Sequence, residues 1–241
     1  MDYVLETKGL SKTYGRARAL IGVDMKVPAG SVYGLVGKNG SGKTTLMRLV
    51  TGLASPSGGS FALYGAADGA GLREARKKIG AVIETPAVYP TMSAAGNLAM
   101  QCRIKGVRDR ACIGELLETA GLADTGKKKA RDFSLGQKAR LALALALVGD
   151  PDFLLLDEPA NGLDPEGIIE MRELLVHLSR EKGKTILVSS HILSELSRVA
   201  THYGFINNGA LIKEITAAGI QADDDAGLEE YYMRLIGGAQ K

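Results

Sequence analysis

The residues best suited to do chemistry lie in one glycine-rich segment, which matches the phosphate-binding pattern G-x-x-x-x-G-K-[ST] at every position. The glycines allow successive backbone N–H groups to turn toward phosphate oxygens, and a helix that follows would present its positive end to them. In this pattern Lys43 reaches the β- and γ-phosphates, and the Thr44 hydroxyl binds Mg²⁺. The segment therefore predicts a nucleoside triphosphate site rather than a simple turn. Its residues are Gly37, Lys38, Asn39, Gly40, Ser41, Gly42, Lys43 and Thr44, with Thr45 directly after them.

Two neighbouring acids end an apolar segment, Phe153–Leu156, in the second half of the chain. A strand there would deliver Asp157 to the edge at which ligands bind in open α/β sheets. Asp157 can hold Mg²⁺ at that edge, while Glu158 points in a different direction and can polarise an attacking water molecule. An apolar strand that ends in two acids is often only a strand end that reaches solvent. Its combination with the phosphate loop predicts triphosphate hydrolysis.

A third motif, Phe133-Ser134-Leu135-Gly136-Gln137, opens a run rich in leucine and alanine. With the two motifs above, it resembles the signature sequence of ATP-binding cassette (ABC) transporter ATPases, whose usual form is Leu-Ser-Gly-Gly-Gln. Phe133 stands for the leucine and Leu135 for the first glycine. Ser134 would cap a helix whose amino end, with the Gly136 backbone, can face a phosphate. The alternative is that Ser134 caps a core helix and has no further role.

The resemblance extends from Tyr3 to about Ile215 and implies further roles. Tyr14 looks like the aromatic residue that stacks on adenine, with a half-buried strand tyrosine as the alternative. His191 matches the switch histidine that contacts the γ-phosphate, and Asn161–Asp164 looks like the D-loop that crosses the dimer interface. The residues that the resemblance implies for ATP binding are Tyr14, the phosphate loop together with Thr45, and the signature residues Ser134, Gly136 and Gln137. Its catalytic residues would be Lys43, Glu158 and His191, and its metal-binding residues Thr44, Glu84 and Asp157.

Glu84 departs from the family pattern, which usually has glutamine at this position, in contact with Mg²⁺, water and the membrane partner. A glutamate here resembles the ATPases of bacitracin and lantibiotic self-protection exporters, which also tolerate a Ser-Leu-Gly signature. A carboxylate can ligate Mg²⁺, but it cannot donate a hydrogen bond as an amide can. The alternative is a solvated residue at a strand end.

These residues require a fold that brings them together at one edge of a β-sheet. Strand patterns alternate with helical ones, which is typical of a parallel sheet with helices on its faces. The first thirty residues instead alternate as extended strands do, at Tyr3–Thr7 and Ala19–Val27. We therefore expect an α/β fold of the P-loop NTPase class, with a mainly parallel sheet core, an N-terminal antiparallel β subdomain and an inserted α-helical subdomain. The other expected strands are 31–36, 60–64, 78–83, 153–156, 185–189 and 203–206, and the helices around them are 43–51, 166–181 and 193–200.

The inserted helical subdomain is expected at about residues 85–150, with helical patterns near 93–104, 110–120 and 135–148. The last pattern is ambiguous because its leucines and alanines alternate at period two. Leucine and alanine are strong helix formers and β-branched residues are almost absent, which favours a helix. We expect residues 1–241 to form a single ABC ATPase domain, closed by a short C-terminal cap helix at about 226–237.

The composition narrows the possible partners. The 241 residues include 30 basic and 27 acidic side chains, a net charge of +3, so we expect no nucleic-acid partner. The runs Arg76–Lys78 and Lys127–Lys129 are expected to be solvated. Cys102 and Cys112 match no metal or redox spacing. No apolar run approaches the ~18 residues that cross a bilayer.

The resemblance implies a homodimer in the ATP-bound state, in which each nucleotide lies between one phosphate loop and the signature of the other subunit. It also implies an integral membrane permease as a separate partner, and a cytoplasmic protein held peripherally on the inner face of the cell membrane. One rival is a soluble non-transport ABC ATPase, which usually carries a coiled-coil insertion or two cassettes. Another is a GTPase, but no Asn-Lys-x-Asp guanine-binding motif is present.

Overall fold

A six-stranded sheet forms the centre of the computed structural model, which describes residues 2–84, 88–223 and 227–238. The strand order is β5-β6-β7-β3-β8-β9, and every neighbouring pair is parallel except β8 and β9. The mainly parallel core is therefore confirmed. The strands are β3 (Val32–Val36), β5 (Ile79–Val82), β6 (Phe153–Asp157), β7 (Thr185–Ser190), β8 (His202–Asn207) and β9 (Ala210–Thr216).

A second, three-stranded sheet in the order β2-β1-β4 is antiparallel, as expected for the N-terminal part. Its strands are β1 (Tyr3–Tyr14), β2 (Ala17–Pro28) and β4 (Gly58–Leu63). The first two are longer than the sequence indicated, because Tyr14 pairs with Ala17 across a tight turn. Gly15 has φ +58° in that turn, a conformation in which glycine is favoured.

Two apolar layers cover the central sheet. Alternate residues of β6 divide between them: Phe153 and Leu155 face the N-terminal sheet and helix α1 (Lys43–Thr51), whereas Leu154 and Leu156 face the opposite layer. The opposite layer includes α6 (Pro165–Arg180) and α7 (Leu193–Leu196). A strand buried on both faces explains why this segment is continuously apolar.

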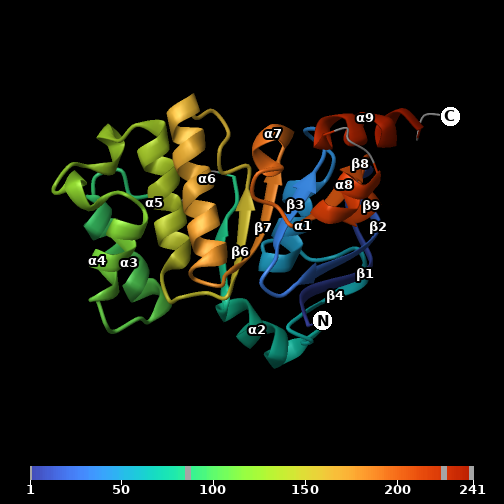
Figure 1. The fold of residues 1–241 in the computed structure, drawn as a ribbon. Helices are drawn as coiled ribbons and strands as arrows, with labels where there is room; N and C mark the ends of the chain where they lie inside the picture. Colours follow the sequence, from blue (N-terminus) through green and yellow to red (C-terminus); the bar gives the residue numbers. More distant parts are fainter. Residues whose placement is uncertain (1, 85–87, 224–226, 239–241) are drawn as a thin grey trace.

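The helical insert packs beside this sheet, on the left in Figure 1. It contains α3 (Ala94–Lys105), α4 (Cys112–Thr119) and α5 (Leu135–Leu147) and has its own apolar cluster. The ambiguous leucine and alanine run is a helix, as predicted. The second half of α5, Leu141–Leu147, is buried all round because it contributes both to the insert and to the main core. The expected start of the insert, at residues 85–87, lies outside the described residues.

Some elements differ from the sequence expectation. The helix expected at 193–200 ends at Leu196, and the Thr201 N–H then donates to the Val32 carbonyl as the chain enters β8. Among the described elements, β9, α2 (Gly69–Lys77) and α8 (Ala217–Asp223) were not predicted, nor were two short 3-10 helices at Ala123–Thr125 and Ala130–Asp132. Glycine weakens a helical pattern, and α2 begins with two glycines in its first three residues.

The last described helix is α9 (Leu228–Gly238), which falls where the sequence predicted a helix. Residue 226, where that helix was expected to begin, lies outside the described residues. Figure 1 shows α9 across the end of the sheet near β8, beside the carboxyl ends of the parallel strands. Within the described ranges, no helix combines the length and the apolar character that crossing a bilayer requires.

Candidate nucleotide-binding site

The phosphate loop joins β3 to α1 and needs glycine at two points of close approach. A Cβ at Gly37 would lie 2.4 Å from the Ile206 carbonyl oxygen, and one at Gly42 would lie 2.7 Å from the Ala19 carbonyl oxygen. Gly42 also has φ +114° and precedes the first residue of α1 without a side-chain cap. The N–H groups of the first turn of α1 are therefore free of a capping side chain and available to an anion.

Lys43 occupies the centre of this loop and is 5% exposed. Its Nζ donates to the carbonyl oxygens of Gly37 at 2.7 Å and Lys38 at 3.2 Å, and it lies 3.2 Å from Glu158 Oε1. A buried ammonium group is stable only with such partners. The Ser41 hydroxyl, by contrast, is buried and has no hydrogen-bond partner among the described residues. The loop thus offers both a cation and an unsatisfied hydroxyl to an anionic ligand.

Asp157 is held at the carboxyl end of β6, as predicted, and each of its carboxylate oxygens accepts one hydrogen bond. Thr44 Oγ1 donates to Oδ2 at 2.7 Å, and Ser189 Oγ donates to Oδ1 at 2.6 Å. Ser189 can reach it because the two residues are paired in the β6–β7 register. Ser189 was not predicted from the sequence, because a single sequence does not show which residues of two strands are paired.

Glu158 follows Asp157 with a left-handed backbone, φ +51°, which turns its side chain away from the strand direction. Its N–H is held by the Ser189 carbonyl at 3.2 Å and hydroxyl at 2.9 Å. Its carboxylate contacts Lys43 through Oε1 and is hydrogen-bonded to His191 Nδ1 through Oε2. The structure therefore brings together the three residues predicted to be catalytic: Lys43, Glu158 and His191.

A cleft of about 820 Å³ separates the phosphate loop from the helical insert. Thr44, Asp157 and Glu158 line one wall, and Leu135 and the next turn of α5 line the other. The volume is in the range of small-molecule sites. The cleft places the acids, the loop and the start of the signature helix around one space.

The signature motif caps α5 as predicted. Ser134 Oγ accepts the Gln137 N–H at 3.2 Å, and Gln137 Oε1 accepts the Ser134 N–H at 3.2 Å, which makes a reciprocal capping box. Leu135, which replaces the usual glycine, is 55% exposed. A Cβ at Gly162 in the expected D-loop would lie 3.3 Å from the Leu135 side chain. The unusual leucine is therefore in position to contact the D-loop of its own chain.

Glu84 lines the same cleft but contacts Arg48 of α1 rather than Thr44 or Asp157. The Arg48 Nη2 and Glu84 Oε1 atoms are 2.6 Å apart, and the Glu84 side chain is 53% exposed. Hydrogen bonding to Glu84 raises the pKa of Arg48, and Tyr14 adds to this shift. Glu84 also has φ +57°. Arg48, like Ser189, was not predicted from the sequence as a residue of the site.

Tyr14 stands apart from the residues that line the cleft. It ends β1, is 43% exposed, and its ring lies 4.8 Å from Lys12 Nζ. Its interaction with Arg48 links it to Glu84 on the cleft wall. Stacking on adenine stays a prediction for this residue, and so do the phosphate contacts of Ser134, Gly136 and Gln137.

The fold and the site define a P-loop nucleoside triphosphatase with an inserted helical subdomain. The sequence belongs to the ABC transporter family, whose profile matches residues 20–161. It is similar to the bacitracin transport ATP-binding protein BcrA of Enterococcus faecalis, at 40% identity over 89% of this chain and 70% of BcrA. It is also similar to the lantibiotic transport ATP-binding protein SrtF of Streptococcus pyogenes, at 40% identity over 97% of both chains.

A solved structure shows the same fold in a dimer. This is the ATP-binding cassette MJ0796 in a post-hydrolysis state, bound to ADP and Pi. The two proteins are 26% identical with a TM-score of 0.79, over 88% of this chain and 98% of that chain. The predicted family and fold class are confirmed, and with them the assignment as the ATP-binding subunit of an ABC transporter.

Proposed function

We propose that this chain binds ATP with Mg²⁺ and hydrolyses it to power transport by a separate integral membrane permease. The observation that carries the proposal is the contact of Glu158 with both Lys43 and His191, beside the Thr44–Asp157 hydrogen bond. We propose further that the chain acts as one cassette from its N-terminal sheet to α9.

The oxygen atoms in the site fit Mg²⁺ better than a softer metal. Thr44 Oγ1 and Asp157 Oδ2 lie together, and hydroxyl and carboxylate oxygens are the ligands that Mg²⁺ prefers. The described residues contain no cluster of three or more His, Cys, Asp or Glu side chains that could hold a metal by themselves. This suits an ion that is bound by one or two protein oxygens together with substrate phosphates. When bound, Mg²⁺ would neutralise charge on the β- and γ-phosphates.

The residues of the chain suggest how the site changes when ATP enters. The Lys43 ammonium now contacts Glu158, and a triphosphate in the loop offers it stronger acceptors. Transfer of Lys43 to the phosphates would release one oxygen of Glu158 to accept a proton from the attacking water. His191 would hold the other oxygen and fix the orientation of the carboxylate. Lys43 is therefore proposed to couple ATP binding to activation of Glu158.

A homodimer would complete the site. Ser134 and Leu135 are exposed at the amino end of α5, where the free N–H groups of a helix can bind phosphate. No hydrogen bond among the described residues joins them to the phosphate loop of the same chain. The dimeric cassette of similar fold, with ADP and Pi bound, supports ATP-dependent pairing of two copies.

We propose a peptide antibiotic as the transported substrate, with export or self-protection as the purpose. The names of the two relatives, which describe bacitracin transport and lantibiotic transport, support this substrate class. The chain would then work in the cytoplasm, held on the inner face of the membrane by the permease near Glu84. The alternative, a non-transport ABC ATPase, has no comparable support among these relatives.

Purification of the native chain from membranes tests the transport proposal. We expect an integral membrane protein to co-purify, and we expect its detergent complex to hydrolyse ATP. The Lys43→Ala variant should keep the complex and lose hydrolysis. A chain recovered from native membranes without any integral partner, and with full ATPase activity, would favour the non-transport alternative.

A further inference from the structure

The phosphate loop rests on β8. A Cβ at Gly37 would lie 2.4 Å from the Ile206 carbonyl oxygen and 2.9 Å from its side chain, so the loop passes this strand in close contact. Val36, the last residue before the loop, is paired with Phe205 in the sheet. The position of the loop therefore depends on the position of β8.

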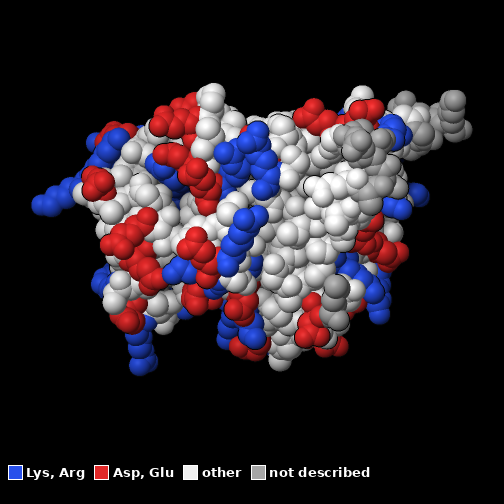
Figure 2. Space-filling model, in the orientation of Figure 1, with Lys and Arg blue, Asp and Glu red and all other residues white. Residues whose placement is uncertain are grey.

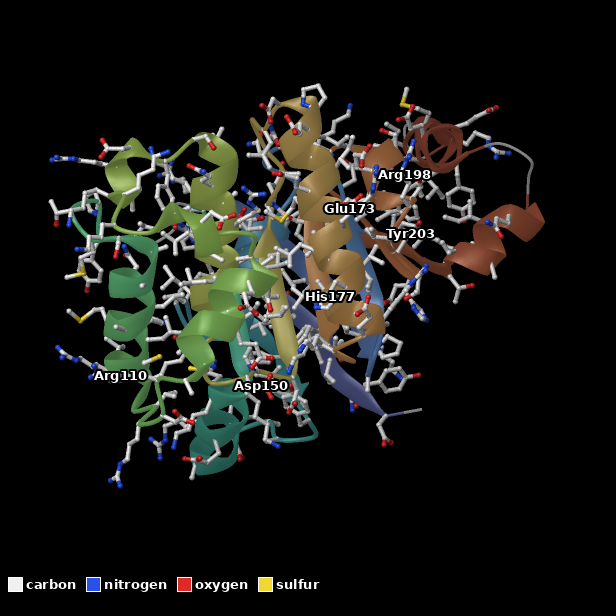
Figure 3. The ribbon with its side chains drawn as sticks, turned by 60° about the vertical axis from the view of Figure 1, so that its left-hand side comes forward. Arg110, Asp150, Glu173, His177, Arg198 and Tyr203 are labelled. Atoms are coloured by element: carbon white, nitrogen blue, oxygen red, sulfur yellow. The ribbon has the colours of Figure 1, made fainter. Side chains whose placement is uncertain are left out.

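Helix α9 packs on that strand through two tyrosines. The Phe205 ring centroid lies 5.6 Å from that of Tyr231 and 5.9 Å from that of Tyr232. The two tyrosines are 7% and 8% exposed. Tyr203, labelled in Figure 3, belongs to the same cluster where the sheet meets the C-terminal helices. The cap helix thus contacts the strand that supports the loop.

The Tyr232 hydroxyl is buried and, among the described residues, has no hydrogen-bond partner. Burial raises the pKa of Tyr232, and an interaction with the Lys38 backbone opposes this rise. A neighbouring group lowers the pKa of a phenol by donating to its oxygen, so the group concerned is the Lys38 N–H. Lys38 is the second residue of the phosphate loop, so the unsatisfied hydroxyl of α9 lies beside the backbone of that loop.

We propose that α9 braces the phosphate loop, with Tyr232 as a positioning residue whose hydroxyl accepts the Lys38 N–H when the loop closes on a triphosphate. This inference rests on the proposed ATP site. Tyr232 acts on the ligand only through Lys38. Because the bond is complete in the closed loop and incomplete in the open one, it stabilises the ligand-bound conformation over the free one.

Nucleotide titration of the purified full chain tests the brace with three variants. Tyr232→Phe removes only the hydroxyl, and we expect ATP to bind about 3- to 10-fold more weakly. Thermal stability should change little, because the hydroxyl is unsatisfied in the free protein. In steady state the KM for ATP should rise by the same factor while kcat stays within about twofold.

Tyr231→Leu is the matched control, since it disturbs the packing of α9 on the same Phe205 ring. We expect it to lower the melting temperature and leave ATP affinity within about twofold. Lys43→Ala provides the reference for a disabled site. The brace is contradicted if Tyr232→Phe binds ATP as the unmodified chain does, or if Tyr231→Leu weakens ATP binding as much as Tyr232→Phe. If the unmodified chain binds no ATP, or if Lys43→Ala binds ATP as well as the unmodified chain does, the proposed function fails and the brace with it.

Discussion

Glu84 and Glu158 have left-handed backbones at the ends of the neighbouring strands β5 and β6, with φ +57° and +51°. Such conformations cost of order 1–3 kcal/mol for a residue other than glycine and persist where the surrounding structure enforces them. At Glu158 the enforcing contacts are two hydrogen bonds from its N–H to Ser189. The strain directs both carboxylates toward the cleft, where they can act on a ligand.

We predict that Lys43→Ala weakens ATP binding about 10- to 100-fold, because it removes a buried cation from the centre of the phosphate loop. Calorimetric titration with ATP measures the effect. Lys77→Ala is the control, since the Lys77 side chain is 71% exposed and pairs with Glu74 on α2. Equal affinity in the unmodified chain and Lys43→Ala would show that the loop does not bind the nucleotide.

The second prediction concerns the Glu84 carboxylate. If it moves from Arg48 to Mg²⁺ at the γ-phosphate, its charge is tolerated there only while the metal is present. We therefore expect Glu84→Gln to weaken the dependence of ATP affinity on Mg²⁺, and Glu84→Ala to lower hydrolysis. Titrations with Mg²⁺ and with EDTA measure the dependence.

Arg48→Gln separates the metal contact from the ion pair. It removes the same ion pair as Glu84→Gln, in which Arg48 Nη2 and Glu84 Oε1 are 2.6 Å apart, but keeps the carboxylate. We expect this variant to retain the Mg²⁺ dependence of the unmodified chain. An unchanged Mg²⁺ dependence in Glu84→Gln would remove the metal contact and leave docking of the membrane partner as the proposed role of Glu84.

At the scale of elements, helix α5 joins the insert to the catalytic core. Its amino end lines the cleft with Leu135, and its buried faces contribute to two apolar clusters. The capping box formed by Ser134 and Gln137 fixes where this helix begins. A change at the cap therefore acts on both the stability and the geometry of the site.

We expect Ser134→Ala to lower the free energy of unfolding by about 1 kcal/mol, the usual cost of losing an N-cap. If Ser134 also faces the phosphate of a partner subunit, kcat should fall by more than this loss of stability explains. Chemical denaturation and steady-state ATPase assays of the same preparation measure the two effects. Full kcat in a destabilised variant would restrict Ser134 to the capping role.

The sequence predicted most elements that position the site, because each has a local signal. Helix α1 has the expected limits, and the run of leucine and alanine is a helix, as its propensity indicated. The contacts made by Ser189 and Arg48 were not predictable. They arise from strand register and from the approach of α1 to the end of β5, which a single sequence does not reveal.

At the scale of the whole molecule, charge does not single out one large surface on the face shown in Figure 2, where acidic and basic side chains lie side by side over the insert and α6. The distinctive surface is the cleft between the phosphate loop and α5. If the amino end of α5 contacts the phosphate of a partner subunit, as proposed, two chains related by a twofold axis would complete two sites together. ATP would then be the contact that joins the subunits.

The mass of the Glu158→Gln chain in ATP and Mg²⁺, measured by size-exclusion chromatography with light scattering, tests the ATP-bound dimer and the role of Glu158 together. Glutamine preserves the size of the side chain but cannot act as a general base, so ATP should bind and remain intact. We expect a stable dimer that retains ATP, with steady-state hydrolysis abolished, whereas the unmodified chain should turn over and return to a monomer. A monomeric Glu158→Gln chain with unchanged turnover would contradict both the catalytic role of Glu158 and the ATP-bound dimer.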